Sequence, residues 1–193
     1  MHPVEHPSPR WPRAVALCAA LLVGAAGCGD DPFAFDWSDT PDTVLLYSMA
    51  RPEMNLQSAF NFRQRRAIEV EAPSSAGSWD AAVDTRGGEV VLLPPGALGV
   101  IGAARITTLA GLKLDDVRQA PGDTLVYVGD RPVTVAMGNV YVIRTNRSRG
   151  SYGTSCTYYA KMAPVVIDAA GGTLTFEYVT NPVCNSTDLV PPK

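Results

Sequence analysis

Two strand-forming segments near the C-terminus, each flanked by a cysteine, constrain the fold of this chain more than any other feature of its sequence. Residues 156–167 and 173–180 are rich in Val, Ile, Thr, Tyr and Phe, which favour β-strands. The sequence Asp-Ala-Ala-Gly-Gly between them, at 168–172, is typical of a tight hairpin loop with a glycine in the left-handed conformation. It predicts an antiparallel hairpin with residues 169–171 as its loop.

The register of this hairpin predicts a disulfide. With that loop, Asp168 lies opposite Gly172, and the same register places Cys156 opposite Cys184. The bond closes a loop of 29 residues, which is worth about 3 to 4 kcal/mol in the chain-entropy model. We interpret the bond as structural rather than redox-active, because the chain contains no CxxC sequence.

The chain before this hairpin has the same β-type composition, with Gly, Pro and Asp between the segments. Further strands are expected at 43–47, 67–71, 78–83, 89–93, 105–109, 124–128, 133–136 and 139–145. One stretch, residues 112–119, is compatible with two helical turns. The sequence therefore predicts a single all-β domain, an antiparallel sheet or sandwich with one short helix.

An uncharged run of 15 residues between Glu89 and Arg105 has the hydrophobicity of a membrane segment. Its prolines and glycines would break a helix, so we expect a strand followed by an apolar loop. This loop is either buried or at the surface, and if part of residues 97–101 is exposed, it marks a contact surface.

The N-terminus has the three zones of a secretory signal: a polar stretch with two arginines, an apolar run at 14–26, and small residues before a cysteine. The apolar run has 13 residues, whereas a membrane-spanning helix needs about 20. The sequence Ala-Ala-Gly-Cys at 25–28 resembles the lipobox of bacterial lipoproteins. We therefore predict a lipoprotein signal peptide at 1–27. The alternative is an ordinary signal peptide, cleaved after Ala26 or Gly27.

Cleavage at this position defines the mature chain. Residues 28–41 become a tether lipidated at Cys28, and residues 42–193 form the all-β domain. Glycine rather than aspartate follows the lipidated cysteine, so we expect a membrane anchor in the cell envelope, at the outer membrane. The tether contains three alternating aromatic residues that we expect to dock on the domain: Phe33, Phe35 and Trp37.

Charge and composition argue against an enzyme and against nucleic-acid binding. Cleavage removes both histidines, and with them the commonest general base and metal ligand. The mature chain carries 14 basic and 18 acidic residues, which is not the charge of a nucleic-acid binder. Asp80 and Asp84, four apart in a predicted strand, lie about 13 Å apart on one face, too far for paired-carboxylate catalysis. We expect neither catalysis nor a metal site.

A basic cluster, Arg63, Arg65 and Arg66, lies beside aromatic residues of the same segment. Arginines in such a cluster bind a carboxylate or an anionic headgroup. We expect a solvated loop face here, with anion binding as the alternative.

Several segments resemble one known family when they are taken in order. Residues 139–145, 159–162 and 172–179 resemble the C-terminal signature of the HmuY-like haem-binding lipoproteins. Residues 79–82 are similar to the WDxA strand of that family, and residues 114–121 to its short segment ending in proline. The resemblance covers roughly residues 78 to 180.

The resemblance implies an all-β, lipid-anchored protein that holds haem between axial side chains, usually histidine and in some relatives methionine. The mature chain has no histidine, so Met137 and Tyr159 are the candidate ligands for haem or another apolar molecule. The alternative interpretation is that Met137 closes a turn against the core and that Tyr159 faces one side of the sheet. The alternative function is a structural or protein-interaction lipoprotein without a cofactor, whose partner is an envelope protein or an outer-membrane receptor.

Overall fold

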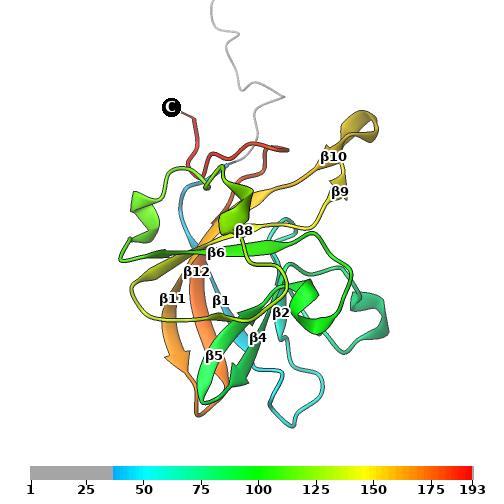
Figure 1. The fold of residues 1–193 in the computed structure, drawn as a ribbon, viewed down its shortest axis with the longest axis vertical. Coiled ribbons are helices and arrows are strands. Elements are labelled where there is room, and N and C mark those ends of the chain that lie inside the picture. Colours follow the sequence, from blue (N-terminus) through cyan, green and yellow to red (C-terminus); the bar gives the residue numbers. More distant parts are fainter. Residues whose placement is uncertain (1–36, 193) are drawn as a thin grey trace, which may run out of the picture. The chain divides into compact units, whose positions relative to one another are not determined.

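Two five-stranded antiparallel sheets face each other in residues 37–192, the part of the chain that the computed structural model describes (Figure 1). The predicted all-β sandwich is confirmed. The expected signal peptide, the lipidation site Cys28, and the tether residues Phe33 and Phe35 lie outside the described residues. No helix in residues 37–192 is long and apolar enough to cross a bilayer.

The two sheets and a small third one account for all the named strands of the described residues. The first sheet has the order β1 (Asp42–Tyr47), β12 (Thr173–Thr180), β11 (Tyr159–Asp168), β8 (Asn139–Arg144) and β6 (Arg105–Ala110). The second has the order β3 (Arg66–Ile68), β2 (Ala59–Asn61), β4 (Ala81–Arg86), β5 (Glu89–Leu93) and β7 (Val133–Thr134). The third pairs β9 (Ser148–Arg149) with β10 (Ser155–Cys156). Short 3₁₀ turns connect them: η2 (Pro73–Ser75), η3 (Pro95–Leu98), η4 (Leu114–Asp116), η5 (Thr124–Val126) and η6 (Ser151–Gly153).

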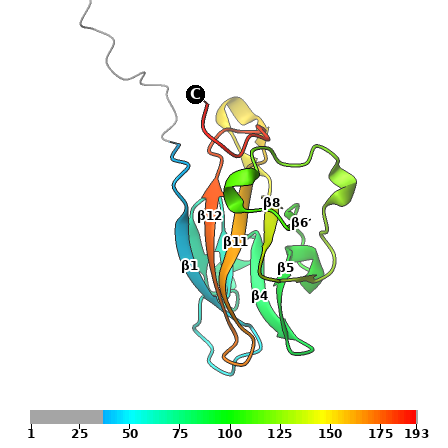
Figure 2. The same cartoon turned by 90° about the vertical axis from the view of Figure 1, so that its left-hand side faces the viewer.

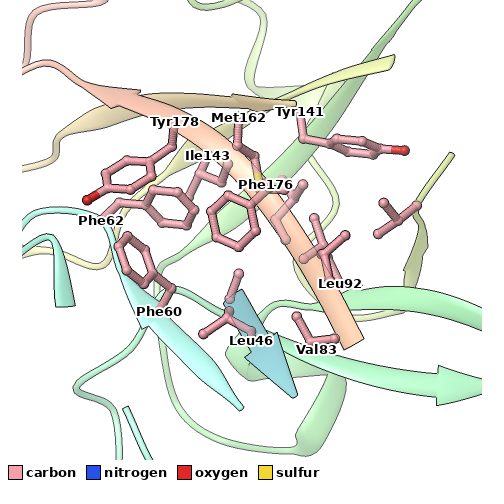
Figure 3. Close-up of a cluster of buried hydrophobic side chains, with 14 of the residues drawn as sticks. Leu46, Phe60, Phe62, Val83, Leu92, Tyr141, Ile143, Met162, Phe176 and Tyr178 are labelled. Atoms are coloured by element: carbon pink, nitrogen blue, oxygen red, sulfur yellow. The ribbon is translucent and has the colours of Figure 1, made fainter. Parts of the chain in front are cut away.

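The core lies between the two large sheets because alternate residues of each strand point inward. Phe60 from the second sheet meets Phe176 and Tyr178 from the first, and the Phe60 and Tyr178 ring centroids lie 4.8 Å apart in an edge-on arrangement (Figure 3). Met162 is fully buried among them. Side chains therefore fill the space between the sheets.

A second apolar cluster covers the outer face of the first sheet, where the segment containing η4 and η5 crosses it (Figure 2). Lys161 of β11 is buried beneath this segment, and its ammonium group donates to the carbonyl oxygens of Leu114 and Val117, each at 2.9 Å. Burial lowers the pKa of Lys161. The lysine thus ties the covering segment to the sheet.

The apolar run after β5 is mostly half-buried, between its two predicted forms. Ala97, Leu98 and Val100 pack against a third cluster, which contains Trp79. Ile101 is the exception, with 98 % of its surface exposed. Part of the segment 97–101 is therefore exposed, which is the condition stated for a contact surface.

Two predicted elements near the covering segment are wrong. The expected helix at 112–119 shortens to the single turn η4, because the chain then extends to bond with the C-terminal segment through Arg118 and Ala120. The expected strand at 124–128 is the turn η5, because the Asp123 carboxylate caps it by accepting from the Leu125 N–H at 2.9 Å.

Strand boundaries also differ from those expected in the first half of the chain. The strand predicted at 78–83 starts at Ala81 and continues to Arg86, and the one predicted at 67–71 is β3. β2 was not predicted, because it has only three residues. The strand predicted at 156–167 is divided between β10 and β11.

The hairpin of β11 and β12 has a different loop from the expected one, but at the strand ends away from the loop it has the expected register. Asp168 pairs with Thr173 instead of Gly172, because its carboxylate accepts from the Gly171 N–H and holds a longer loop. A bulge between Pro164 and Val166 then shifts the register by one residue. Beyond the bulge the expected register returns.

The restored register agrees with the position of the predicted disulfide. Cys156 and Cys184 form this bond, and their Cα atoms lie 5.0 Å apart. The disulfide prediction is confirmed.

Candidate functional site

A buried carboxylate, Asp80, joins separate segments at one end of the sandwich. Only 2 % of Asp80 is exposed. One of its oxygens accepts from the Phe62 N–H at 2.9 Å, and the other accepts from the Asn146 N–H at 2.7 Å. Asp80 therefore fixes the β2–β3 turn relative to the chain that leaves β8.

Asn146 extends this network. Its amide nitrogen donates to the Trp79 carbonyl at 2.6 Å, and its amide oxygen accepts from the N–H groups of Ala103 and Ala104 at 2.7 and 3.0 Å. The segment before β6 is thus held to the same point. The Asp80 and Asn146 side chains together make five hydrogen bonds to the main chain at this end of the molecule.

Burial raises the pKa of Asp80 to about 6, and the hydrogen bonds from Asn146 and Phe62 oppose this rise. The described residues show no basic side chain in an ion pair with Asp80. Asp84 lies farther along β4, where it forms an ion pair with Arg86 at 2.9 Å. The two carboxylates hold structural contacts, and they do not form the pair that acid–base catalysis requires.

The turn that Asp80 holds presents two arginines beside a tyrosine. The Arg63 guanidinium lies over the Tyr158 ring, 5.2 Å from its centroid. Together with Arg65 they border a hollow of about 240 Å³, which we call the arginine notch. Its lining residues are Arg63, Arg65, Tyr158, Thr180, Asn181 and Pro182.

The walls of the arginine notch are held by hydrogen bonds. The Thr180 hydroxyl donates to the Phe62 carbonyl at 3.1 Å, which ties the turn to the end of β12. The Tyr158 N–H donates to the Thr145 hydroxyl at 3.0 Å, and the Tyr158 carbonyl accepts from the Thr145 N–H at 2.9 Å. The backbone around the notch is therefore preorganised, so little conformational entropy is lost when a ligand binds.

Both notch arginines are exposed, and neither takes part in an ion pair within residues 37–192. Asp42 lines a neighbouring hollow of about 110 Å³ that shares Arg65 with the notch. Arg66, the third arginine of the cluster, lines a different hollow, beside Glu69. Two open guanidinium groups with parallel N–H donors suit a carboxylate or a phosphate.

The chain between β8 and β11 forms the β9–β10 arm, which projects from the two large sheets (Figure 1). Tyr152 at its tip is fully exposed, and Arg147 and Arg149 along it are also exposed. The disulfide between Cys156 and Cys184 holds its root. Tyr158 follows the arm directly, so the arm and the notch are neighbours.

The two candidate haem ligands lie far apart. Met137 is 59 % exposed in the turn before β8, next to Gly138, whose φ is +79°. Tyr159 is half-buried and pairs with Arg144 at the opposite end of β8. The first and last residues of β8 are five steps apart along the strand, which corresponds to about 17 Å. The structure does not bring the two side chains into one site.

Tyr158 was missed as a partner of the arginine cluster because 95 positions separate it from Arg63. The described residues contain no group of three or more His, Cys, Asp or Glu side chains arranged to hold a metal ion. No protein-family model matches the chain, and no curated protein matches it.

Proposed function

We propose that the mature protein is a non-catalytic binding module of the cell envelope, anchored through Cys28, that binds an anionic group in the arginine notch. The observation that carries this proposal is the pair of open guanidinium groups of Arg63 and Arg65 on a rigid platform. The ligand chemistry is a carboxylate or phosphate carried by a larger partner.

The interaction function is better supported than the haem-binding one. Met137 and Tyr159 stand at opposite ends of β8, so they offer no axial pair. The space between the sheets is filled by aromatic and aliphatic side chains. The notch, in contrast, offers unpaired charge, an aromatic wall and fixed geometry, which together favour recognition of an anion at the surface.

The binding test is calorimetric titration of the purified chain from residue 28, with Cys28→Ser, against inorganic phosphate and against acetate. We expect saturable binding that the double variant Arg63→Gln, Arg65→Gln abolishes. The matched control is Arg51→Gln with Arg86→Gln. These two arginines lie outside the notch: Arg86 is the last residue of β4, and Arg51 donates to the Gly171 carbonyl in the β11–β12 loop. Equal binding by both double variants would refute the notch as the site.

The anchor is tested separately in cells. A bacterial host that expresses the full chain with labelled palmitate should transfer label to the protein, and the Cys28→Ala variant should carry none. Equal labelling of both chains, or none in either, would contradict the lipoprotein part of the proposal.

A further inference from the structure

We propose that the arginine notch and the β9–β10 arm together bind the phosphate groups of anionic membrane lipids beside the anchor of the same chain. This inference rests on the proposed function and names its ligand. The notch supplies two exposed arginines, Arg63 and Arg65, and the arm supplies Arg147 and Arg149.

Two acid-free segments bring basic residues to this end, whereas the segment that leads to it, residues 28–42, contains five aspartates and no basic residue. Residues 131–167 contain five basic residues and no Asp or Glu, and residues 54–68 contain three arginines and no acid, although the chain as a whole has a net charge of −3. The two acid-free segments meet where Arg63 stacks on Tyr158. Because the protein as a whole is acidic, an anionic partner is attracted to this basic surface and not to the rest of the molecule.

Carboxylates near this end leave the arginines available. Asp42 borders the hollow next to Arg65, and Asp188 accepts from the Ser186 hydroxyl in the C-terminal segment. Neither forms an ion pair with Arg63 or Arg65 in the described residues. Asp80 is buried and engaged by main-chain N–H groups.

The segment that leads from the expected anchor into β1 lies beside the notch, and this favours a membrane over a soluble partner. Ser38, Thr40 and Asp42 line the hollow that shares Arg65. Trp37 lies nine positions beyond the expected lipidation site Cys28, and a chain of that length reaches at most about 32 Å. Lipidation therefore keeps this end of the domain within reach of the bilayer surface.

The arm fits the same surface. Tyr152 stands fully exposed at its tip, with the backbone at φ +56°. Tyrosine is enriched at membrane interfaces because its ring is apolar and its hydroxyl is polar. Flanking arginines on the arm then meet the phosphate layer, where each basic residue strengthens binding about fivefold.

The experiment is vesicle co-sedimentation of the mature chain with Cys28→Ser, so that no lipid anchor contributes. Vesicles contain phosphatidylcholine alone or phosphatidylcholine with phosphatidylglycerol. We expect binding only to the anionic vesicles, a loss with added salt, and about thirtyfold weaker binding by Arg63→Gln with Arg65→Gln. The control Arg51→Gln with Arg86→Gln should bind as the parent chain does, and circular dichroism should show that both variants are folded.

The possible results separate this inference from the proposed function. Phosphate binding in solution without vesicle binding would overturn the membrane ligand and leave the notch as an anion site. Binding of an Asp- and Glu-rich peptide without vesicle binding would overturn it in favour of an acidic protein partner. Absence of both phosphate and vesicle binding would overturn the inference and the proposed function together. Equal vesicle binding by the two double variants would also overturn it.

Discussion

Replacing Asp80 with asparagine tests whether this buried carboxylate organises the basic end of the molecule. The substitution keeps the shape of the side chain but removes the charge and one of its two acceptor positions. At low pH both side chains are uncharged, but an amide nitrogen cannot accept a hydrogen bond whereas the carboxyl hydroxyl oxygen can. One main-chain N–H, of Phe62 or Asn146, therefore loses its partner, and the variant should be less stable than the parent at low pH.

The pH dependence gives the magnitude. The pKa of Asp80 is about 6 in the folded chain, against an ordinary value of 3.8. The folded state therefore binds this proton more tightly than the unfolded state does, and the free energy of unfolding falls as pH rises through this interval. This difference in pKa between the folded and unfolded chain corresponds to about 3 kcal/mol in the free energy of unfolding. The Asp80→Asn variant has no titrating group at this position. As pH rises through this interval, the free energy of unfolding of the parent should therefore fall by about 3 kcal/mol relative to that of the variant.

Urea denaturation of the two chains between about pH 3 and about pH 8 measures this difference. The exposed substitution Asp130→Asn controls for the change in net charge. Parallel stability curves for the parent and Asp80→Asn would refute the burial that we assign to this carboxylate. A parent that gains stability relative to the variant as pH rises would refute the sign.

Three further results are expected. Replacing Cys156 and Cys184 with serine should lower the free energy of unfolding by about 3 to 4 kcal/mol, and an unchanged denaturation midpoint would contradict a structural disulfide. Phe176→Ala should cost about 3 to 5 kcal/mol in the same assay, because the fully buried ring leaves a cavity between the sheets; a loss below about 1 kcal/mol would contradict close packing there. Haemin added to the mature chain should give no Soret shift, because Met137 and Tyr159 do not converge, and a shift that either substitution abolishes would restore the haem hypothesis.

Strand positions and strand pairing could be predicted where the local sequence, such as a turn between two β-type segments, determined them. The β5 and β12 segments coincide with their predicted bounds, since β-branched residues fill them and turn residues flank them. The hairpin loop was wrong by one residue, yet the bulge at Pro164 and Val166 compensated for it. The disulfide prediction therefore succeeded although its starting loop was wrong.

Other elements depend on contacts that no local pattern contains. The segment 112–119 has helical composition, but bonds to the C-terminal segment extend it. β2 has three residues and forms because β3 and β4 flank it. Tertiary pairing overrides weak local preference in both cases.

The candidate site was predictable only in part. The arginine cluster was visible as a run in the sequence, and anion binding was one of its two interpretations. Its platform Tyr158 lies between β10 and β11, 95 positions beyond Arg63, and the carboxylate Asp80 that orients the turn lies just before β4. Only the fold brings them together.

The most direct test of the central claim is the arginine side-chain NMR spectrum of the mature chain during titration with inorganic phosphate. The account predicts saturating shifts of the Nε–H signals of Arg63 and Arg65, while those of Arg51 and Arg86 stay unchanged. Small shifts of equal size at all four arginines, or no shift at any of them, would contradict an anion site in the arginine notch.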